Sequence, residues 1–571
     1  MKNQLVSRIF RDIARLLEIK GENIFRIRAY DRAAQAVENL GGDIEQAVSR
    51  NTLTDIPGIG KDLADKIREI VATGSLQFYE DLKQTLPAGT LELLAIPSVG
   101  PKTAQMLAKE LRIRSIGDLE KAIADHKLDT LPGIKEKTIE NISKGIALVK
   151  RGQERLPLVR AQAVAEEFVR ELQQLPQVEK IVCAGSLRRQ KETVRDIDIL
   201  VMAKDAQPVM DAFTSSPLAQ ATQAWGSTKS SVRTADGVQV DCRVVDKGSF
   251  GAALLYFTGS KEFNVRLRML AQKTRHKINE YGVFDRNEKR ICGRTEEEIF
   301  KFLKMQYVPP EMREDTGEIE AALKRALPRL VEQKDIQGDL HVHSNWSDGS
   351  NTIAEMAQAA RASGYSYIAV TDHSPSLKVA HGLSAVDLRK KRREIDSLNE
   401  KMKPFRILFG TEADIDADGN IDYPDSVLKE FDIVIAAIHT GMKQPAEQIT
   451  RRIIRACENP HVHIIAHPTG RLRGVRDAYD LDLDAVFQKA KQTNTAFEIN
   501  SYPDRMDLND VNCRRAKEAG VKICINTDSH SIDQLVYIRF GLAMARRGWL
   551  TPQNILNTNN EDALAKALSR R

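Results

Sequence analysis

Three aspartates on alternating apolar segments are the residues of this 571-residue chain that most clearly suggest chemistry. Asp196 and Asp198 alternate with isoleucines, and Asp241 lies in the alternating run 238–245. Residues i and i+2 of a strand point to one face, so these carboxylates can converge on hard divalent cations. Two Mg²⁺ ions held in this way would clamp the attacking and leaving oxygens of a phosphoryl or nucleotidyl transfer. We therefore predict that the three aspartates are metal ligands and catalytic residues, although an isolated D-x-D pair is often only a solvated strand edge.

A glycine and a serine stand shortly before these aspartates, in a turn suited to a phosphate. The apolar run 178–184 has the length of a strand and leads into the sequence G-S-L-R-R at 185–189. Backbone N–H groups of such a turn can face a phosphate. The stretch thus combines a phosphate-binding turn with metal-binding carboxylates.

Further motifs follow in order, namely Y-F-T-G-S at 256–260, Asn264, Arg268 and I-N-E-Y at 278–281. With G-S-x-R-R and D-x-D they resemble the family X DNA polymerases of the polymerase beta type, over residues 1–315. The resemblance implies an α+β nucleotidyltransferase palm with an α/β thumb-like subdomain. It implies nucleotide contacts from Arg155, Gly185, Ser186, Arg189, Tyr256, Phe257, Gly259, Asn264 and Arg268. Val194, Gln239 and Lys261 depart from the animal members, which bears on nucleotide affinity and fidelity.

Two short glycine motifs in the N-terminal part predict contacts with a DNA backbone. They are I-P-G-I-G-K at 56–61 and I-P-S-V-G-P-K at 96–102, and a degenerate copy lies at 131–138. Glycines let the backbone approach a phosphate, and N–H groups at the following helix start donate to it without reading a base. The motifs resemble helix-hairpin-helix elements, with Gly58, Gly60, Gly100 and Lys102 as DNA-binding candidates. A single such motif would more often be a plain connection between helices.

Lys66, in the helical pattern after the first motif, is a further candidate. In animal members of the polymerase family, the N-terminal domain removes a 5′-sugar phosphate through a Schiff-base lysine, and Lys66 falls at its position. Tyr30 fits the same pattern, but Asp62 stands where those enzymes have a basic residue. Lys66 is therefore a candidate lyase residue, a contact for a 5′-phosphate or a solvated helix lysine.

A second chemistry is indicated by the histidines, because nine of the 11 follow residue 340. Seven apolar runs alternate there with helical patterns, at 336–340, 367–370, 406–409, 433–438, 464–466, 496–499 and 521–525. Strands that alternate with helices form a parallel sheet, and the C-terminal ends of such strands meet on one face. We therefore predict a distorted (βα)7 barrel with a metal site at that face, since nearly all the runs end in potential ligands.

The candidate ligands are His341, His343, Asp348, His373, Glu412, His439, His467, Asp528 and His530. Mixed imidazole and carboxylate donors suit Mn²⁺, Zn²⁺ or Fe²⁺ more than Mg²⁺, and nine donors imply two or three ions. Such a centre lowers the pKa of bound water and stabilises charge on a phosphoryl group, which favours phosphoester hydrolysis with His343 as a catalytic candidate. Arg471, Arg473 and Arg505 in nearby loops are candidate phosphate contacts, unless they are solvated loop arginines.

The order and spacing of the nine ligands resemble the polymerase and histidinol phosphatase (PHP) domain. Its pairing with a family X polymerase is typical of bacterial and archaeal enzymes. The pairing implies manganese-dependent 3′-5′ exonuclease activity, with abasic-site cleavage or 3′-phosphate removal as further activities. The expected domains are a helical lyase-like domain (1–80), a second helical domain (81–147), the palm (148–245), a nascent-base-pair subdomain (246–315), a linker (316–335) and the PHP domain (336–571).

The composition is that of a globular protein, and we expect the protein to be cytoplasmic. At roughly 100–200 residues per domain, the length suggests three to five units. No apolar run approaches the roughly 20 residues that span a bilayer, and the start lacks the apolar core of a secretory signal. The six cysteines show no C-x-x-C spacing, so we expect buried free thiols. A net charge of +6 permits nucleic-acid binding but does not demonstrate it.

From these observations we expect a DNA repair polymerase that fills short gaps and trims 3′ ends. Its partners would be gapped or nicked duplex DNA and deoxynucleoside triphosphates, without a membrane, and it would act as a monomer. One alternative is a polymerase fused to a small-molecule phosphatase or pyrophosphatase. Another is a DNA-end binding scaffold with a vestigial polymerase site, against which the complete aspartate triad and Arg189 count.

Overall fold

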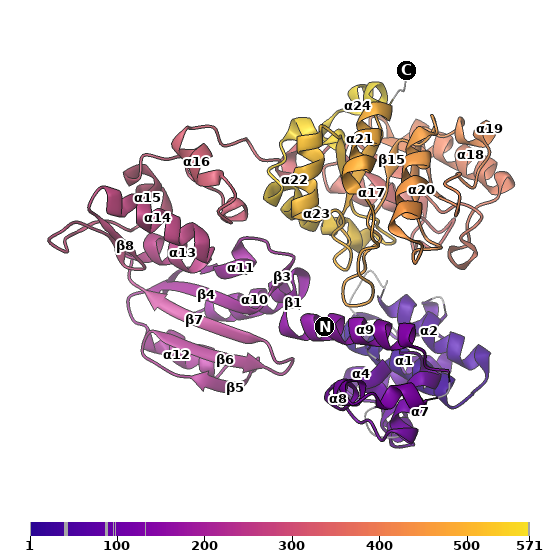
Figure 1. The fold of residues 1–571 in the computed structure, drawn as a ribbon, viewed down its shortest axis with the longest axis horizontal. Helices are drawn as coiled ribbons and strands as arrows, with labels where there is room; N and C mark the ends of the chain where they lie inside the picture. Colours follow the sequence, from indigo (N-terminus) through magenta and orange to yellow (C-terminus); the bar gives the residue numbers. More distant parts are fainter. Residues whose placement is uncertain are drawn as a thin grey trace.

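The computed structural model describes residues 2–38, 44–56, 58–85, 90–94, 96, 99–131 and 133–568. Figure 1 shows a helical N-terminal region, a region built on an open sheet, and a barrel surrounded by helices. Of the predicted hairpins, Pro57, Pro97, Ser98 and Pro132 lie outside the described residues. None of the described helices is long and apolar enough to cross a membrane.

The N-terminal region contains two helical units, each with its own apolar core. The first contains α1 (Lys2–Ile19), α2 (Ile24–Glu38), α3 (Ile44–Ser49), α4 (Lys61–Thr73) and α5 (Gln77–Gln84). The second contains α6 (Thr90–Leu94), α7 (Pro101–Glu110), α8 (Ile116–Ala124) and α9 (Glu136–Glu154), and α9 continues into the palm. Phe10 and Tyr30 are buried in the first core, and Leu107 and Leu119 in the second.

Each predicted hairpin ends at a helix start. Gly60 caps α4 and Gly100 caps α7, while Lys135 of the degenerate third copy caps α9. Gly58 has a left-handed backbone with a φ of +88°, which favours glycine. Because the first N–H groups of a helix have no acceptor within it, these three starts offer backbone donors to a phosphate.

The palm is an open five-stranded sheet with the order β2-β4-β7-β6-β5. Its strands are β2 (Val178–Cys183), β4 (Asp196–Ala203), β5 (Ala219–Ala224), β6 (Lys229–Thr234) and β7 (Gln239–Val245), and a separate pair is formed by β1 (Leu156–Pro157) and β3 (Thr193–Val194). The central pair β4 and β7 is parallel, and its neighbours are antiparallel. Helices α10 (Leu158–Leu172) and α12 (Gln207–Thr214) pack on the sheet through Phe168 and Phe213, and the short α11 (Gly185–Arg188) follows β2.

The following subdomain consists of short helices and a three-stranded sheet. These elements are α13 (Phe250–Thr258), α14 (Lys261–Lys273), β8 (Lys277–Asn279), β9 (Gly282–Phe284), β10 (Arg290–Cys292) and α15 (Glu296–Phe302). The segment predicted as a linker contains α16 (Glu318–Leu323), whose Ile319 and Ala322 are buried. It is therefore packed against the protein rather than extended as a free tether.

Seven parallel strands in sequential order form the barrel, which confirms the predicted (βα)7 class. They are β11 (Gly338–Val342), β12 (Tyr367–Val370), β13 (Arg406–Asp414), β14 (Ile433–Ala437), β15 (Ile464–Ile465), β16 (Ala496–Asn500) and β17 (Ile523–Asn526). The helices are α17 (Ile353–Ala362), α18 (Ala385–Met402), α19 (Asp425–Leu428), α20 (Ala446–Glu458), α21 (Leu483–Thr493), α22 (Asp510–Ala519), α23 (Ile538–Arg547) and α24 (Glu561–Leu568). The first and last strands nearly close the barrel, since His343 N donates to Ser529 O at 2.8 Å.

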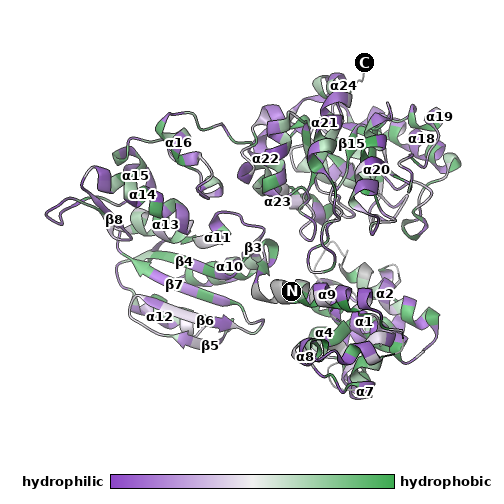
Figure 2. Ribbon diagram, in the orientation of Figure 1, coloured by the Kyte–Doolittle hydropathy of each residue, from purple (hydrophilic) through white to green (hydrophobic). Residues whose placement is uncertain are grey.

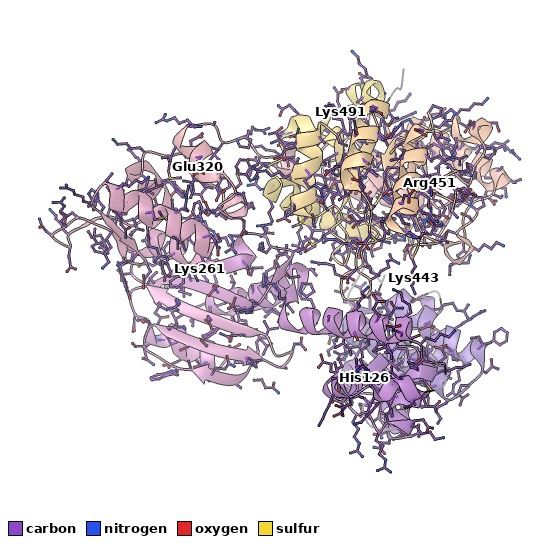
Figure 3. The ribbon with its side chains drawn as sticks, in the orientation of Figure 1. His126, Lys261, Glu320, Lys443, Arg451 and Lys491 are labelled. Atoms are coloured by element: carbon purple, nitrogen blue, oxygen red, sulfur yellow. The ribbon has the colours of Figure 1, made fainter. Side chains whose placement is uncertain are left out.

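Figure 2 shows where hydrophobic and hydrophilic residues lie along these elements, and the hydrophobic residues of the barrel strands are buried. Every residue of β14 is buried, as expected for a strand with helices on one face and the barrel interior on the other. All six cysteines are free thiols, and four of them are buried, as the lack of C-x-x-C spacing predicted. The exposed His126 lies in the helical region, apart from the barrel that gathers most histidines (Figure 3).

Candidate active sites

The three palm aspartates lie on the two central strands of the sheet. Asp196 and Asp198 are on β4, and Asp241 on β7 is paired in register with Asp198. Burial, followed by the charges of Asp196 and Asp241, raises the pKa of Asp198 to about 7. A divalent cation would relieve this repulsion, so the donor set fits a metal site. Gln239, one of the predicted departures from the animal members, donates from Nε2 to Asp241 Oδ1 at 3.1 Å.

Gly185 is required by the close approach of the turn to Asp198. Its φ is +62°, and a Cβ atom added there would lie 2.3 Å from Asp198 Oδ2. Only glycine fits such a position, so the phosphate-type turn is held directly against the carboxylates.

A cavity of about 730 Å³ opens beside the aspartates. Its walls contain Asp196 and Asp198 together with all nine residues predicted to contact the nucleotide: Arg155, Gly185, Ser186, Arg189, Tyr256, Phe257, Gly259, Asn264 and Arg268. Lys261, one of the departures from the animal family members, also lines it and lies between α13 and the palm sheet (Figure 3). Residues that are far apart in the sequence therefore share one basic and acidic pocket.

Hydrogen bonds fix the two arginines predicted to bind the triphosphate. Arg155 donates to Thr193 Oγ1 and to Thr193 O, each at 2.8 Å. Arg189 donates from Nε to Glu314 Oε1 at 3.1 Å and from its terminal nitrogen to Thr258 O. Asn264 Nδ2 donates to Tyr256 O at 2.7 Å, which holds the aromatic turn.

A buried ion-pair network behind the cavity was not predicted from the sequence. Glu296 accepts hydrogen bonds from Arg188 at 2.7 and 2.8 Å and from Arg313 at 2.6 Å. Burial alone would raise the pKa of Glu296, but the two arginines lower it to about 2. Nothing near Glu296 in the sequence signals these partners, because the bonds join residues 108 and 17 positions apart.

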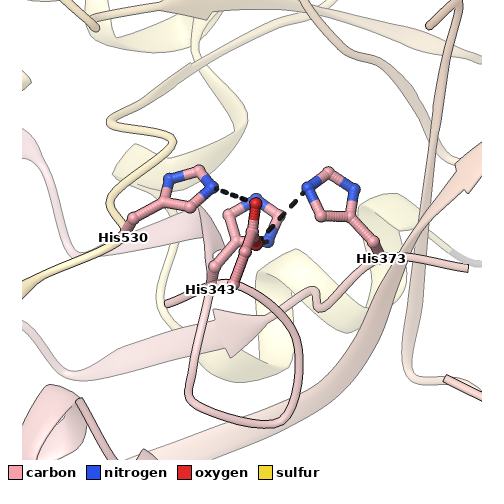
Figure 4. A group of neighbouring side chains, drawn as sticks. His343, His373 and His530 are labelled. Carbon is pink, nitrogen blue, oxygen red and sulfur yellow. Dashed lines mark ion pairs between the residues drawn. The ribbon is translucent and has the colours of Figure 1, made fainter. Parts of the chain in front are cut away.

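The nine predicted barrel ligands meet at the C-terminal ends of the strands. Eight of them form three groups of close donor atoms: His343, Asp348, His373 and His530; His341, His343 and Asp528; and His373, Glu412 and His439. His467, the ninth, has Nε2 2.9 Å from Glu412 Oε1. Asp348 joins His373 and His530 through contacts of 3.6 and 3.4 Å (Figure 4).

The crowding of these donors fits bound cations. His341 Nε2 lies 3.1 Å from His343 Nε2, and the rings of His343 and His530 stack at 4.2 Å. Burial, followed by the neighbours His530 and His373, lowers the pKa of His343 to about 4, so its imidazole is neutral. Its Nδ1 is buried without a hydrogen-bond partner among the residues that the structure describes. Imidazole nitrogens and carboxylates that face one another in this way are the kind of donors that multinuclear transition-metal sites use.

Two further carboxylates orient the ligands and were not singled out in the sequence. Glu498 lies on β16, with Oε1 2.7 Å from His341 Nδ1, and it accepts from His467 N at 2.8 Å. Asp414 Oδ1 lies 3.2 Å from His439 Nδ1. A carboxylate on the outer nitrogen of a histidine directs the other nitrogen to the metal. The sequence does carry a signal for Glu498, namely a glutamate in the middle of an apolar strand.

The three arginines predicted to contact a phosphate in the barrel lie in two different surroundings. Arg505 Nε lies 3.6 Å from Asp528 Oδ2, beside the ligand cluster. Arg471 and Arg473 instead reach the palm, where both bond to Glu192. In the N-terminal unit, Lys66 Nζ bonds to Asp62 Oδ1 at 2.5 Å and lies over the Phe78 ring.

The fold and the two clusters define a protein that joins a nucleotidyltransferase palm to a metal-dependent phosphoesterase barrel. Matching family models are the DNA polymerase beta thumb at residues 253–314, the PHP domain at 339–502, and helix-hairpin-helix domains at 1–76 and 90–147. A protein of Bacillus subtilis (strain 168) called DNA polymerase/3′-5′ exonuclease PolX is 38% identical over 98% of each chain. The chain therefore belongs to the PolX family of family X DNA polymerases with a PHP domain.

Other relatives match about two fifths of the chain. A probable phosphatase of Thermoanaerobacter sp. (strain X514) is 33% identical over 39% of this chain and 90% of its own length. A probable phosphatase of Shewanella sediminis (strain HAW-EB3) is 31% identical over 41% of this chain and 94% of its own length.

Proposed function

We propose that this chain is a DNA-directed DNA polymerase with a 3′-5′ exonuclease, and that it fills short gaps during DNA repair. The observation that carries the proposal is the cavity whose wall brings Asp196 and Asp198 together with nine residues suited to a nucleotide and a template. Membership of the PolX family supports both activities. The protein would act as a cytoplasmic monomer on gapped or nicked duplex DNA.

In the palm, Asp196, Asp198 and Asp241 would hold two Mg²⁺ ions, which would supply charge stabilisation and a lower pKa for the primer 3′-hydroxyl. The chain itself binds and orients the substrates. Arg155 and Arg189 suit the triphosphate, because a guanidinium pairs with two phosphate oxygens at once. The remaining assignments are Ser186 to the phosphates, Tyr256, Phe257 and Gly259 to the sugar, Asn264 to the minor-groove edge and Arg268 to the template.

In the barrel, the nine ligands would hold two or three Mn²⁺, Zn²⁺ or Fe²⁺ ions, which would polarise water and stabilise charge on the terminal phosphodiester. Glu498 and Asp414 keep the histidines in one tautomer and orientation. Arg505, whose Nε lies 3.6 Å from Asp528 Oδ2, would neutralise a phosphate. Abasic-site cleavage would use the same centre, while Lys66 would contact a 5′-phosphate or serve as a lyase residue. Gly58, Gly60, Gly100 and Lys102 would bind the duplex backbone.

The test follows a 5′-labelled primer on a one-nucleotide-gapped duplex with Mn²⁺, with and without nucleotides. The variants Asp198→Ala and His343→Ala are compared with wild type, and the exposed Asp205→Ala and His381→Ala are matched controls. We expect extension to be lost only in Asp198→Ala and shortening only in His343→Ala. Loss of extension in His343→Ala or of shortening in Asp198→Ala would contradict the assignment of one reaction to each site.

A second candidate for the barrel is hydrolysis of a small phosphoester, because several proteins that match about two fifths of this chain are called probable phosphatases. Competition between gapped DNA and a small phosphate ester distinguishes the exonuclease from the small-molecule phosphatase. If gapped DNA inhibits hydrolysis of a small chromogenic phosphate ester by the barrel, both substrates use one site. If the ester is cleaved, DNA does not compete and no primer is shortened, the small-molecule phosphatase is the better assignment.

A further inference from the structure

An arginine of the barrel domain reaches the wall of the polymerase cavity. Arg547, the last residue of α23, is 3% exposed in its side chain. On one side it forms a salt bridge with Asp510 of its own domain at 2.7 Å. On the other side its Nη1 donates to Arg189 O at 2.8 Å and to Glu314 Oε1 at 3.0 Å. It thus touches both members of the Arg189–Glu314 pair.

This pair decides whether Arg189 is available to a triphosphate. The same oxygen of Glu314 accepts from Arg189 Nε at 3.1 Å and from Arg547 Nη1 at 3.0 Å. Glu314 is a charged competitor, because Arg189 and Arg547 lower the pKa that burial would raise. A phosphate must displace this carboxylate from Arg189 in order to use the whole guanidinium. A second arginine on Glu314 weakens the competition, since it compensates the charge that Arg189 leaves behind.

Two other barrel arginines contact the palm segment that holds Arg155, the second arginine predicted to bind the triphosphate. Arg473 Nη1 donates to Glu192 O at 2.5 Å, and Arg471 Nη2 bonds to Glu192 Oε2 at 2.7 Å. Glu192 precedes Thr193, which accepts both hydrogen bonds from Arg155. Barrel arginines therefore contact the palm segment 189–193 at Arg189 and at Glu192, the neighbour of the Thr193 that holds Arg155.

We propose that the barrel domain completes the nucleotide site of the polymerase, and that Arg547 is a positioning residue that keeps Arg189 available to the triphosphate. The inference rests on the proposed polymerase function. It predicts that the barrel affects the affinity of the palm for the nucleotide through these contacts, independently of the hydrolytic reaction of the barrel.

Steady-state extension of a gapped primer tests the proposal with Arg547→Met, Glu314→Gln, the double variant, and Arg539→Met as a control. Arg539 is an exposed arginine on the same helix. We expect Arg547→Met to raise the KM for the nucleotide roughly tenfold, as for a disturbed charge-assisted hydrogen bond, with little change in kcat. Glu314→Gln in the same chain should restore the KM, because the competing charge is gone. Arg539→Met should match wild type.

A role of Arg547 in stability alone would lower the melting temperature without a nucleotide-specific change in KM, and Glu314→Gln would not relieve the defect. Either result would overturn the proposal. Arg547→Lys carries the test if the methionine variant does not fold, since lysine keeps the charge but cannot bridge Asp510 and Glu314 with a planar fork. Absence of extension by the wild type would refute the polymerase function itself, which is a distinct outcome.

Discussion

Asp198 links the palm site to pH. Its pKa is raised from 3.8 to about 7, so in the folded, metal-free protein the carboxylate holds a proton that the unfolded chain would release. This contribution to stability is present below about pH 4 and is lost as the pH rises to about 7. A divalent cation binds only the ionised form, so metal binding and proton binding compete.

We expect the affinity for Mg²⁺ to fall by up to about tenfold for each pH unit below 7, where Asp198 takes up its proton. Calorimetric melting with saturating Mg²⁺ should therefore show a larger stabilisation at pH 8 than at pH 6. The variant Asp198→Asn should bind Mg²⁺ weakly and lose most of this pH dependence. Equal stabilisation of the wild type at both pH values would show that Asp198 does not control metal binding.

A functional residue could be predicted from the sequence when the residues next to it in the chain indicate its role. The gathering of the nine predicted barrel ligands could be anticipated because all of them except Asp348 come at the end of an apolar run, and strand ends of a parallel barrel must meet. Glu314 and Glu192 could not, because their partners Arg547 and Arg471 are 233 and 279 positions away. No periodicity or turn chemistry encodes which surface arginine of one domain meets a carboxylate of another.

At the scale of elements, a buried lysine joins α18 to two strands of the barrel. Lys391 is fully buried, and its ammonium donates to Val370 O at 2.9 Å and to Gly410 O at 3.1 Å. It also pairs with Asp372 Oδ2 at 2.8 Å, and Asp372 accepts from Ser344 N at 2.8 Å, close to the ligand His343. The basic run at 389–393 of α18 gave no indication that its third residue, Lys391, points inward.

We expect Lys391→Met to destabilise the protein by about 3–5 kcal/mol, because it leaves the buried Asp372 without its counter-charge. Urea unfolding followed by tryptophan fluorescence measures the change, since Trp346 lies in the loop that Asp372 holds. Exposed Lys390→Met is the matched control on the same helix. Adding Asp372→Asn to Lys391→Met should recover part of the loss, and a double variant as unstable as the sum of both changes would refute the pairing.

For the whole molecule, the order of domains could be predicted but their packing could not. The predicted linker 316–335 is packed, with Val331 N bonded to Leu550 O at 3.0 Å. Ile336 and the palm residue Phe168 belong to one continuous apolar cluster that extends into the barrel. Arg546 adds a salt bridge to Glu311 at 2.7 Å. Composition and motifs describe each unit separately, whereas this contact surface depends on side chains that look like ordinary solvated charges in the sequence.

Glu192 gives a test of this packing, because it is the palm carboxylate that faces Arg471 and Arg473. Glu192→Arg would place a third positive charge against them, and like charges at an interface cost several kcal/mol. We expect the barrel to separate from the palm, so the radius of gyration from small-angle X-ray scattering should increase at low salt.

Hydrolysis in the barrel should continue in Glu192→Arg, since the predicted metal ligands are untouched, whereas the KM for the nucleotide should rise. The control Glu179→Arg makes the same charge change at an exposed position of β2. An unchanged radius of gyration in Glu192→Arg would mean that apolar contacts alone hold the two domains together, and that Arg471 and Arg473 do not contribute to holding them.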